Sequence, residues 1–235
     1  IVDAAALAIY SPAGTVVHTG DFKVDYTPVY GDAIDLQRFA ELGKKGVLAL
    51  MCDSTNAERQ GFTPSEKKLG PVFDALFEEH KKTRIIIATF ASNVDRVQQI
   101  INTADKFGRK VVVEGRSMVN IIETASNLNR ISIPDNTLID IERLKNYPKD
   151  KTVIITTGSQ GESMAALSRM ASGMHKKITI AKGDTIIFSS SPIPGNEKAI
   201  TKVINELFKK GADVIFQDTH VSGHACQEEI KLIYT

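Results

Sequence analysis

Residues 84–113 read RIIIATFASNVDRVQQIINTADKFGRKVVV, and this stretch decides the fold. An apolar run over 84–89 is followed by a segment that Ser92 is expected to cap as a helix and that ends before Gly108. A second apolar run then covers 110–113. Short strands joined by a helix of this length indicate a right-handed crossover between parallel strands. The stretch therefore predicts a parallel sheet covered by helices.

The same alternation continues on both sides of this unit. A helix is expected to run towards His80 from Thr63 as its N-cap, with Pro64 in the first turn and Glu66 at N3. Further strands are predicted at 153–157, 185–190 and 213–216, and further helices at about 117–128, 162–172 and 196–209. The segment from about 63 to 217 is thus predicted to form a doubly wound α/β domain.

The first part of the chain has a different pattern. Apolar runs over 4–10 and 15–18 are joined by a Ser-Pro-Ala-Gly turn, which predicts an antiparallel pair. A short helix over 34–42 is expected to close at Gly43, and 47–51 is expected to form a buried strand. This segment reads as a separate, β-rich region.

Composition limits the function classes. The 235 residues are 42% hydrophobic and 24% charged with a net charge of +1, so any anion-binding site must be local. Cys52 and Cys226 are far apart and have no CxxC spacing, which argues against a disulfide framework and a thiolate zinc site and for a reducing compartment. No apolar run reaches membrane-spanning length. Because the chain begins at Ile1 and stops at Thr235 within an apparent helix, we expect a fragment of a longer protein.

The segment 217–226, QDTHVSGHAC, follows a predicted strand and contains two histidines around a Ser-Gly pair. Loops at strand ends carry chemistry in α/β proteins, and imidazoles transfer protons or bind metals. The HxxxH spacing would place both histidines on one helix face, but Gly223 argues against a helix, so we assign His220 and His224 separate roles. The alternative is a turn with two surface histidines.

Four other loops carry candidate groups, and each has a structural alternative as a turn or helix cap. Gly158–Gly161 would cradle a phosphate at a helix start. The hydroxyls of 189–191 precede a proline-stiffened turn and suit anionic oxygens. Asn93 and Arg96 would reach a phosphate, and Asp21 would ligate a cation.

Six motifs taken together resemble the ribonuclease J family, in the β-CASP branch of the metallo-β-lactamase superfamily. They are HTGDF at 18–22, MCDSTNAE at 51–58, ATFASN at 88–93, GSQGE at 158–162, FSSSPIPGNE at 188–197 and THVSGHA at 219–225. The motifs occur in the family's order, and the resemblance covers essentially the whole chain.

The resemblance implies a division of the chain and a metal-dependent reaction. Residues 1–62 would be part of a metallo-β-lactamase domain, 63–217 the β-CASP domain, and 218–235 the return into the first domain. Asp21 would bridge two zinc ions, and Asp53 and His224 would be a catalytic pair in which the histidine protonates the leaving oxygen. Because the family's HxHxDH ligands lie outside this chain, the fragment alone is expected to be inactive and not to retain the zinc ions.

The resemblance also implies an RNA-binding surface. The positions expected to hold RNA phosphates, the 5′ end or the walls of the RNA path are Ser92, Asn93, Arg96, Ser159, Ser189, Ser190, Ser191, His220, Ser222 and Gly223. The parent protein would be a cytoplasmic zinc ribonuclease, both endonucleolytic and 5′-3′ exonucleolytic on single-stranded RNA. Its partners would be copies of itself and other RNA-degradation proteins.

Three other interpretations stay open at this point. A β-CASP protein with a degenerate metal site would bind RNA or act as a scaffold without cleaving it. A Rossmann-type nucleotide-binding protein would share the α/β pattern, although no GxGxxG is present. A DNA substrate is the third.

Overall fold

The computed structural model of the protein describes residues 3–216 and 219–235, which fold into two compact units. The terminal unit runs up to Lys68 and resumes at Val221, and the central unit comprises Leu69–His220. The boundary expected at 217/218 falls on residues outside the described ranges.

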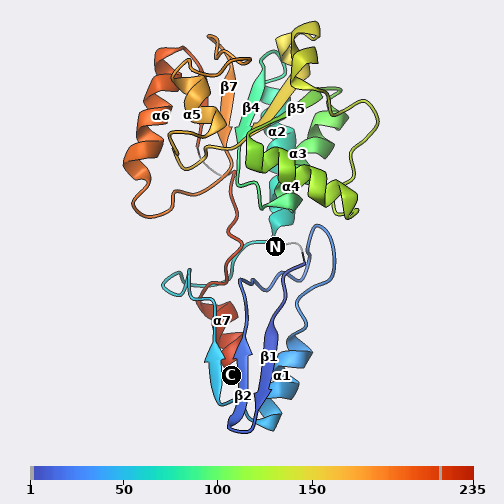
Figure 1. Ribbon diagram of the computed structural model, residues 1–235, viewed down its shortest axis with the longest axis vertical. Helices are drawn as coiled ribbons and strands as arrows, with labels where there is room; N and C mark the ends of the chain where they lie inside the picture. Colours follow the sequence, from blue (N-terminus) through green and yellow to red (C-terminus); the bar gives the residue numbers. More distant parts are fainter. Residues whose placement is uncertain (1–2, 217–218) are drawn as a thin grey trace. The chain divides into compact units, whose positions relative to one another are not determined.

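The central unit contains five parallel strands in the order β5-β6-β4-β7-β8 (Figure 1). The strands are β4 (Ile85–Ala88), β5 (Lys110–Glu114), β6 (Thr152–Thr156), β7 (Thr185–Phe188) and β8 (Asp213–Ile215). In register, Ile86 of β4 lies between Ile154 and Ile186. The predicted helix-covered parallel sheet is confirmed. Every residue of β4, β6 and β7 is buried, as expected for strands covered on both faces.

Helices cover both faces of this sheet (Figure 1). On one face, α5 (Ala166–Ala171) and α6 (Glu197–Lys209) pack with the sheet around Ile86, Ile154 and Phe188. On the other are α2 (Leu69–Glu79), α3 (Val94–Lys106) and α4 (Arg116–Asn127). Two 3₁₀ segments, η2 (Ile141–Asn146) and η3 (Lys149–Lys151), lead into β6.

The terminal unit is built on a three-stranded sheet in the order β1-β2-β3. The predicted antiparallel pair is confirmed as β1 (Leu7–Ser11) and β2 (Gly14–His18), and β3 (Ala49–Met51) adds in parallel to β2. Its helices are α1 (Leu36–Lys45), the 3₁₀ segment η1 (Glu66–Lys68) and α7 (Gln227–Tyr234). A small core forms where Phe22, Val24 and Ala225 pack with Cys52 and with apolar side chains of α1 and α7.

Two element predictions in the terminal unit were wrong. Helix α1 does not stop at Gly43 but continues to Lys45, and Gly46, with φ of 90°, ends it. The strand expected to be buried is instead exposed at Ala49 and Met51, because these residues lie on one face of the small sheet while only the other face is covered within the described unit.

Three helix starts also differ from expectation. Thr63 does not cap a helix: η1 begins at Glu66 and α2 at Leu69. Asn93, rather than Ser92, caps α3, because its side-chain oxygen accepts the Arg96 amide at 3.1 Å. Helix α5 begins at Ala166, not at residue 162. At Thr63 the local capping pattern was present, but the amide of this residue donates to Glu229 instead.

Candidate functional site

Asp53 and His224 form a direct pair in the terminal unit. Asp53 follows β3 and His224 precedes α7, and His224 Nδ1 lies 2.8 Å from Asp53 Oδ2. Because a carboxylate only accepts hydrogen bonds, Nδ1 carries the proton of this contact. The Asp53 side chain is 2% exposed and that of His224 is 31% exposed, so the imidazole remains open to a ligand.

Hydrogen bonding outweighs burial at Asp53. Burial raises the pKa of this carboxyl, but hydrogen bonds from the Thr55 amide and from His224 lower it below its ordinary value. Asp53 is therefore ionised at neutral pH and orients the imidazole through its Nδ1 side, leaving Nε2 to meet a reacting group.

Asp21 completes a cluster with this pair. One ligand atom each from Asp21, Asp53 and His224 lies within 4.8 Å of the others. Gly20 turns the chain with φ of +62°, and a Cβ there would lie 2.9 Å from the Ala5 carbonyl oxygen, so only glycine fits. The cluster opens onto a hollow of about 590 Å³ lined by His18, Gly20, Asp21, Met51, Cys52, Asp53, Ser54 and Thr55.

Thr19 ties the two loops of this hollow together, and sequence reasoning missed it. Its buried hydroxyl accepts the Asp53 amide at 3.0 Å and donates to the Gly20 carbonyl at 2.7 Å. The Thr19 amide donates to the Met51 carbonyl. The only sequence signal for this role was the position of Thr19 directly before Gly20-Asp21.

Burial raises the pKa of the Cys52 thiol, which lies next to Asp53 in the sequence, so this thiol stays protonated at neutral pH.

The loop that carries His224 is held by Asn56. The Asn56 side-chain amide donates to Ser222 Oγ at 2.8 Å and to the His224 carbonyl at 3.1 Å. Ser222 Oγ also accepts the His224 amide at 3.1 Å. The Ser222 hydroxyl is thus engaged in shaping the loop, and the part-buried Gly223 lies between these residues.

In the central unit, Arg96 gathers a second group of candidate residues at the carboxyl ends of the strands. Its guanidinium is fully buried and donates to the carbonyl and hydroxyl oxygens of Ser189, both at 2.9 Å, and to the Thr219 carbonyl at 3.4 Å. His220 Nδ1 lies 3.5 Å from Arg96 Nη1, and the Ser189 hydroxyl donates to the Thr219 carbonyl. Arg96 therefore holds residues 189–191, the serine loop, against residues 219–220, and its guanidinium does not face solvent.

Gln160 joins the remaining serines, a role that the sequence motifs did not predict for it. This buried side chain donates to Ser190 Oγ at 3.2 Å and to the Ser191 carbonyl at 2.9 Å, and it accepts the Ile193 amide at 2.8 Å. Ser159 and Ser190 are buried beside it, whereas Ser191 is part-exposed and Ser92 is exposed. Contrary to expectation, Gly158–Gly161 does not open a helix. It carries Gln160, whose side-chain amide binds the serine loop and Ile193.

Gly161 allows this fastening segment to approach α6. Its φ is +75°, and a Cβ there would lie 2.5 Å from the Ala199 carbonyl carbon, which is backbone and has no freedom to move aside.

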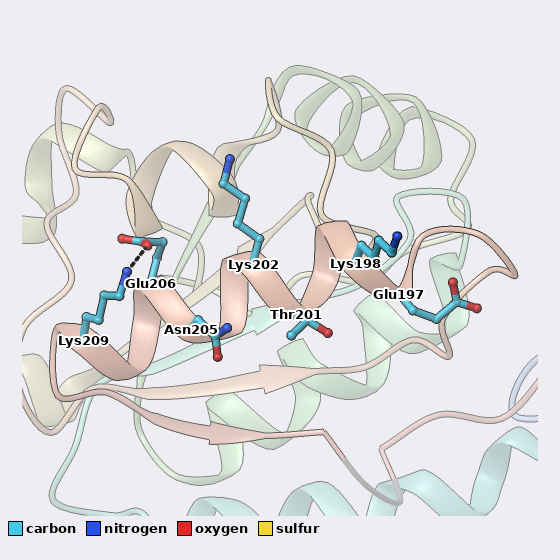
Figure 2. Close-up of a pocket in the computed structure, with 7 residues that line it drawn as sticks. All are labelled: Glu197, Lys198, Thr201, Lys202, Asn205, Glu206 and Lys209. Carbon is cyan, nitrogen blue, oxygen red and sulfur yellow. Dashed lines mark hydrogen bonds and ion pairs between the residues drawn. The ribbon is translucent and has the colours of Figure 1, made fainter.

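A second hollow of about 460 Å³ lies along α6 itself (Figure 2). Its walls are exposed side chains of both charges from one helix, with Lys209 and Glu206 paired at 2.7 Å, which is typical of a solvated helix face.

The family assignment comes from comparison with known proteins. Residues 82–207, over half of the chain, match the family model described as "Ribonuclease J, beta-CASP domain". The chain belongs to the ribonuclease J family. The matched residues include Arg96, Gln160 and the serine loop, so the ribonuclease J resemblance of the sequence motifs is confirmed.

Individual relatives agree with the family. The chain is 48% identical to ribonuclease J of Synechocystis over 99% of this chain and 37% of that protein. It is 44% identical to ribonuclease J2 of Bacillus subtilis, again over 99% of this chain and 42% of that protein. The chain thus spans roughly two fifths of the length of these ribonuclease J proteins.

A solved structure supports the fold. A protein of unknown function from Enterococcus faecalis superposes with a TM-score of 0.63 at 17% identity, covering 97% of this chain and 51% of that protein. Within the described residues, no helix has the length and hydropathy needed to cross a membrane.

Proposed function

We propose that the protein carrying this chain is an RNA-processing nuclease that hydrolyses phosphodiester bonds. The pairing of His224 with Asp53, beside Asp21, is the observation that carries the proposal in a chain of the ribonuclease J family. The chemical groups lie in the terminal unit, and the central unit is proposed to bind RNA.

The chemistry follows from what the reaction needs. Hydrolysis at neutral pH needs an activated water, neutralisation of charge at the phosphate and a proton for the departing oxygen. His224, oriented through Nδ1 by Asp53, is proposed to give the proton from its part-exposed ring. The buried Asp53 would stabilise the protonated imidazole.

The donor set is consistent with zinc. Carboxylate oxygens are zinc ligands, and a carboxylate oxygen of Asp21 lies within 4.8 Å of a ligand atom of Asp53 and of one of His224. Asp21 would hold the metal next to Asp53, and the metal would supply Lewis acidity and a bound water of lowered pKa. Since zinc takes about four ligands, we propose that further ligands come from outside this chain, and that the chain alone is inactive.

RNA binding is proposed to divide between contact residues and residues that shape the loops. Ser92, Ser191 and His220 are exposed or part-exposed and would meet RNA phosphates, as would the loop with Ser222 and Gly223. The remaining candidates are buried or act as a cap, and would support these loops: Asn93, Arg96, Ser159, Ser189 and Ser190.

The finer assignments are proposals of the same kind. We propose that 1–62 and 218–235 belong to a metallo-β-lactamase domain and 63–217 to the β-CASP domain. The parent enzyme would act in the cytoplasm on single-stranded RNA, both endonucleolytically and from the 5′ end. It would assemble with copies of itself and with other RNA-degradation proteins.

The test uses the full-length protein with zinc and a 5′-labelled single-stranded RNA. Cleavage that chelation abolishes and zinc restores would support the proposal. RNA binding without cleavage at any metal concentration would overturn it in favour of an RNA-binding scaffold, and equal cleavage of single-stranded DNA would overturn the assignment of RNA as substrate.

A further inference from the structure

We propose that Glu229 is a positioning residue that fixes the segments following Asp21 and His224 and, through Thr63, holds the His224 backbone against the loop that carries Asp53. The inference rests on the function proposed for those three residues. Glu229 lies in the first turn of α7 (Figure 1) and is fully buried. A buried carboxylate is stable only where hydrogen bonds replace its hydration.

Both carboxylate oxygens of Glu229 accept backbone amides from these segments. Oε1 accepts the Val24 amide at 2.7 Å, and Oε2 accepts the amides of Thr63 at 2.6 Å and Cys226 at 2.8 Å. Val24 follows Asp21 closely, and Cys226 follows His224. One carboxylate therefore joins three parts of the chain, two of which lead directly into the candidate site.

Thr63 extends the connection to the two members of the catalytic pair. Its hydroxyl donates to the His224 carbonyl at 2.7 Å, which is the same carbonyl that Asn56 binds at 3.1 Å. Asn56 belongs to the loop that begins at Asp53. Displacement of the Thr63 segment would thus move the His224 backbone relative to the Asp53 loop.

These contacts exceed what helix capping requires. In a capping box the N3 glutamate accepts the amide of its own N-cap, and Cys226 and Glu229 form such a box here. The two additional amides come from residues 205 and 166 positions away in the sequence. The apolar core beside them is built from the same segments, through Phe22, Cys52 and Ala225.

The experiment compares Glu229→Gln with Glu228→Gln in the full-length protein. The control changes the neighbouring glutamate of α7, which is surface-exposed and paired only with Lys231 among its described ion-pair contacts. Glutamine at 229 keeps one acceptor oxygen but turns an NH₂ group towards backbone amides. With ¹⁵N-labelled histidine and no metal or RNA, the His224 Nδ1 signal bonded to Asp53 is expected to shift or disappear in Glu229→Gln and to stay unchanged in Glu228→Gln.

Kinetics provide the second readout. With zinc, kcat for RNA cleavage is expected to fall about 10- to 100-fold in Glu229→Gln, the usual range for a residue that orients a metal or catalytic group, while KM stays within about twofold. Leu42→Ala controls for lost stability, because Leu42 is buried in α1 outside the core cluster around Phe22. It is expected to lower the urea midpoint without changing kcat.

An unchanged His224 signal in folded Glu229→Gln would overturn the positioning role, and so would an equal loss of kcat in Leu42→Ala. If Glu229→Gln does not fold, urea titration of the wild type decides: the His224 signal and the protection of the Val24, Thr63 and Cys226 amides must vanish together, and separate transitions would refute the proposal. If the wild type cleaves no RNA, the proposed function fails, while the His224 signal still tests the role of Glu229.

Discussion

Replacement of Gln160 by leucine is expected to loosen the serine loop and weaken RNA binding. Gln160 makes two short hydrogen bonds, to the Ser191 carbonyl at 2.9 Å and from the Ile193 amide at 2.8 Å, and two longer ones at 3.2 and 3.4 Å. If the short bonds contribute about 0.5–1.5 kcal/mol each, leucine costs about 1–3 kcal/mol. A cost of about 2 kcal/mol corresponds to roughly a 30-fold loss of amide protection, since about 1.4 kcal/mol is tenfold.

The assay combines amide hydrogen exchange at Ile193, urea unfolding and RNA affinity. Gln99→Leu is the matched control, because Gln99 is also buried in the central unit but its Nε2 has no hydrogen-bond partner among the described residues. That variant is expected to be neutral or slightly stabilising. If Gln160→Leu is no more destabilising than Gln99→Leu and Ile193 exchanges as in the wild type, Gln160 does not fasten the loop.

Three further outcomes are expected. The pKa of Asp53 is lowered in the fold, so its contribution to stability is present above the unfolded pKa of about 3.9 and is lost as the pH falls through the lower folded pKa. Asp53→Asn should therefore reduce the acid dependence of stability in chelator-treated protein. A pH profile of the urea midpoint equal to that of the wild type would contradict this expectation. Gly161→Ala should destabilise by at least about 1–3 kcal/mol, since a Cβ meets the α6 backbone and φ is positive; a thermal midpoint equal to the wild type would refute this packing. The 235-residue chain alone should bind fewer than two zinc ions and show no RNA turnover, and two equivalents of zinc by metal analysis, lost in Asp21→Ala, would show that its own donors suffice.

The sheet was predictable because its strands are covered on both faces, and such strands appear in the sequence as short, nearly continuous apolar runs. Ile85–Ala88 and Thr185–Phe188 are inner strands of the sheet, and each is wholly buried. The family motifs led to Asp53 and His224, whose side chains lie 2.8 Å apart in the structure; the catalytic role of this pair stays a prediction. Local sequence patterns were thus sufficient to identify which segments form strands and which form loops.

The features that were not predicted from the sequence depend on contacts between residues far apart in the chain. Thr63-Pro64-Ser65-Glu66 satisfies every local rule for a helix start, yet the Thr63 amide binds Glu229 instead. Arg96 was assigned to RNA because a guanidinium suits a phosphate. In the structure the side chain is fully buried and its guanidinium donates to the Ser189 carbonyl. Glu229 itself looks like an ordinary polar residue of α7, and only the tertiary fold brings Val24 and Thr63 to it.

The central claim is that His224, oriented by Asp53, supplies the proton in RNA cleavage. Single-turnover cleavage by the zinc-loaded full-length protein at saturating RNA tests it most directly, with His224→Ala compared to Ser191→Ala. The account predicts a loss of about 10²–10⁴-fold in the cleavage rate for His224→Ala with little change in RNA affinity, whereas Ser191→Ala retains the rate and binds RNA somewhat more weakly. A wild-type cleavage rate in His224→Ala would contradict the account.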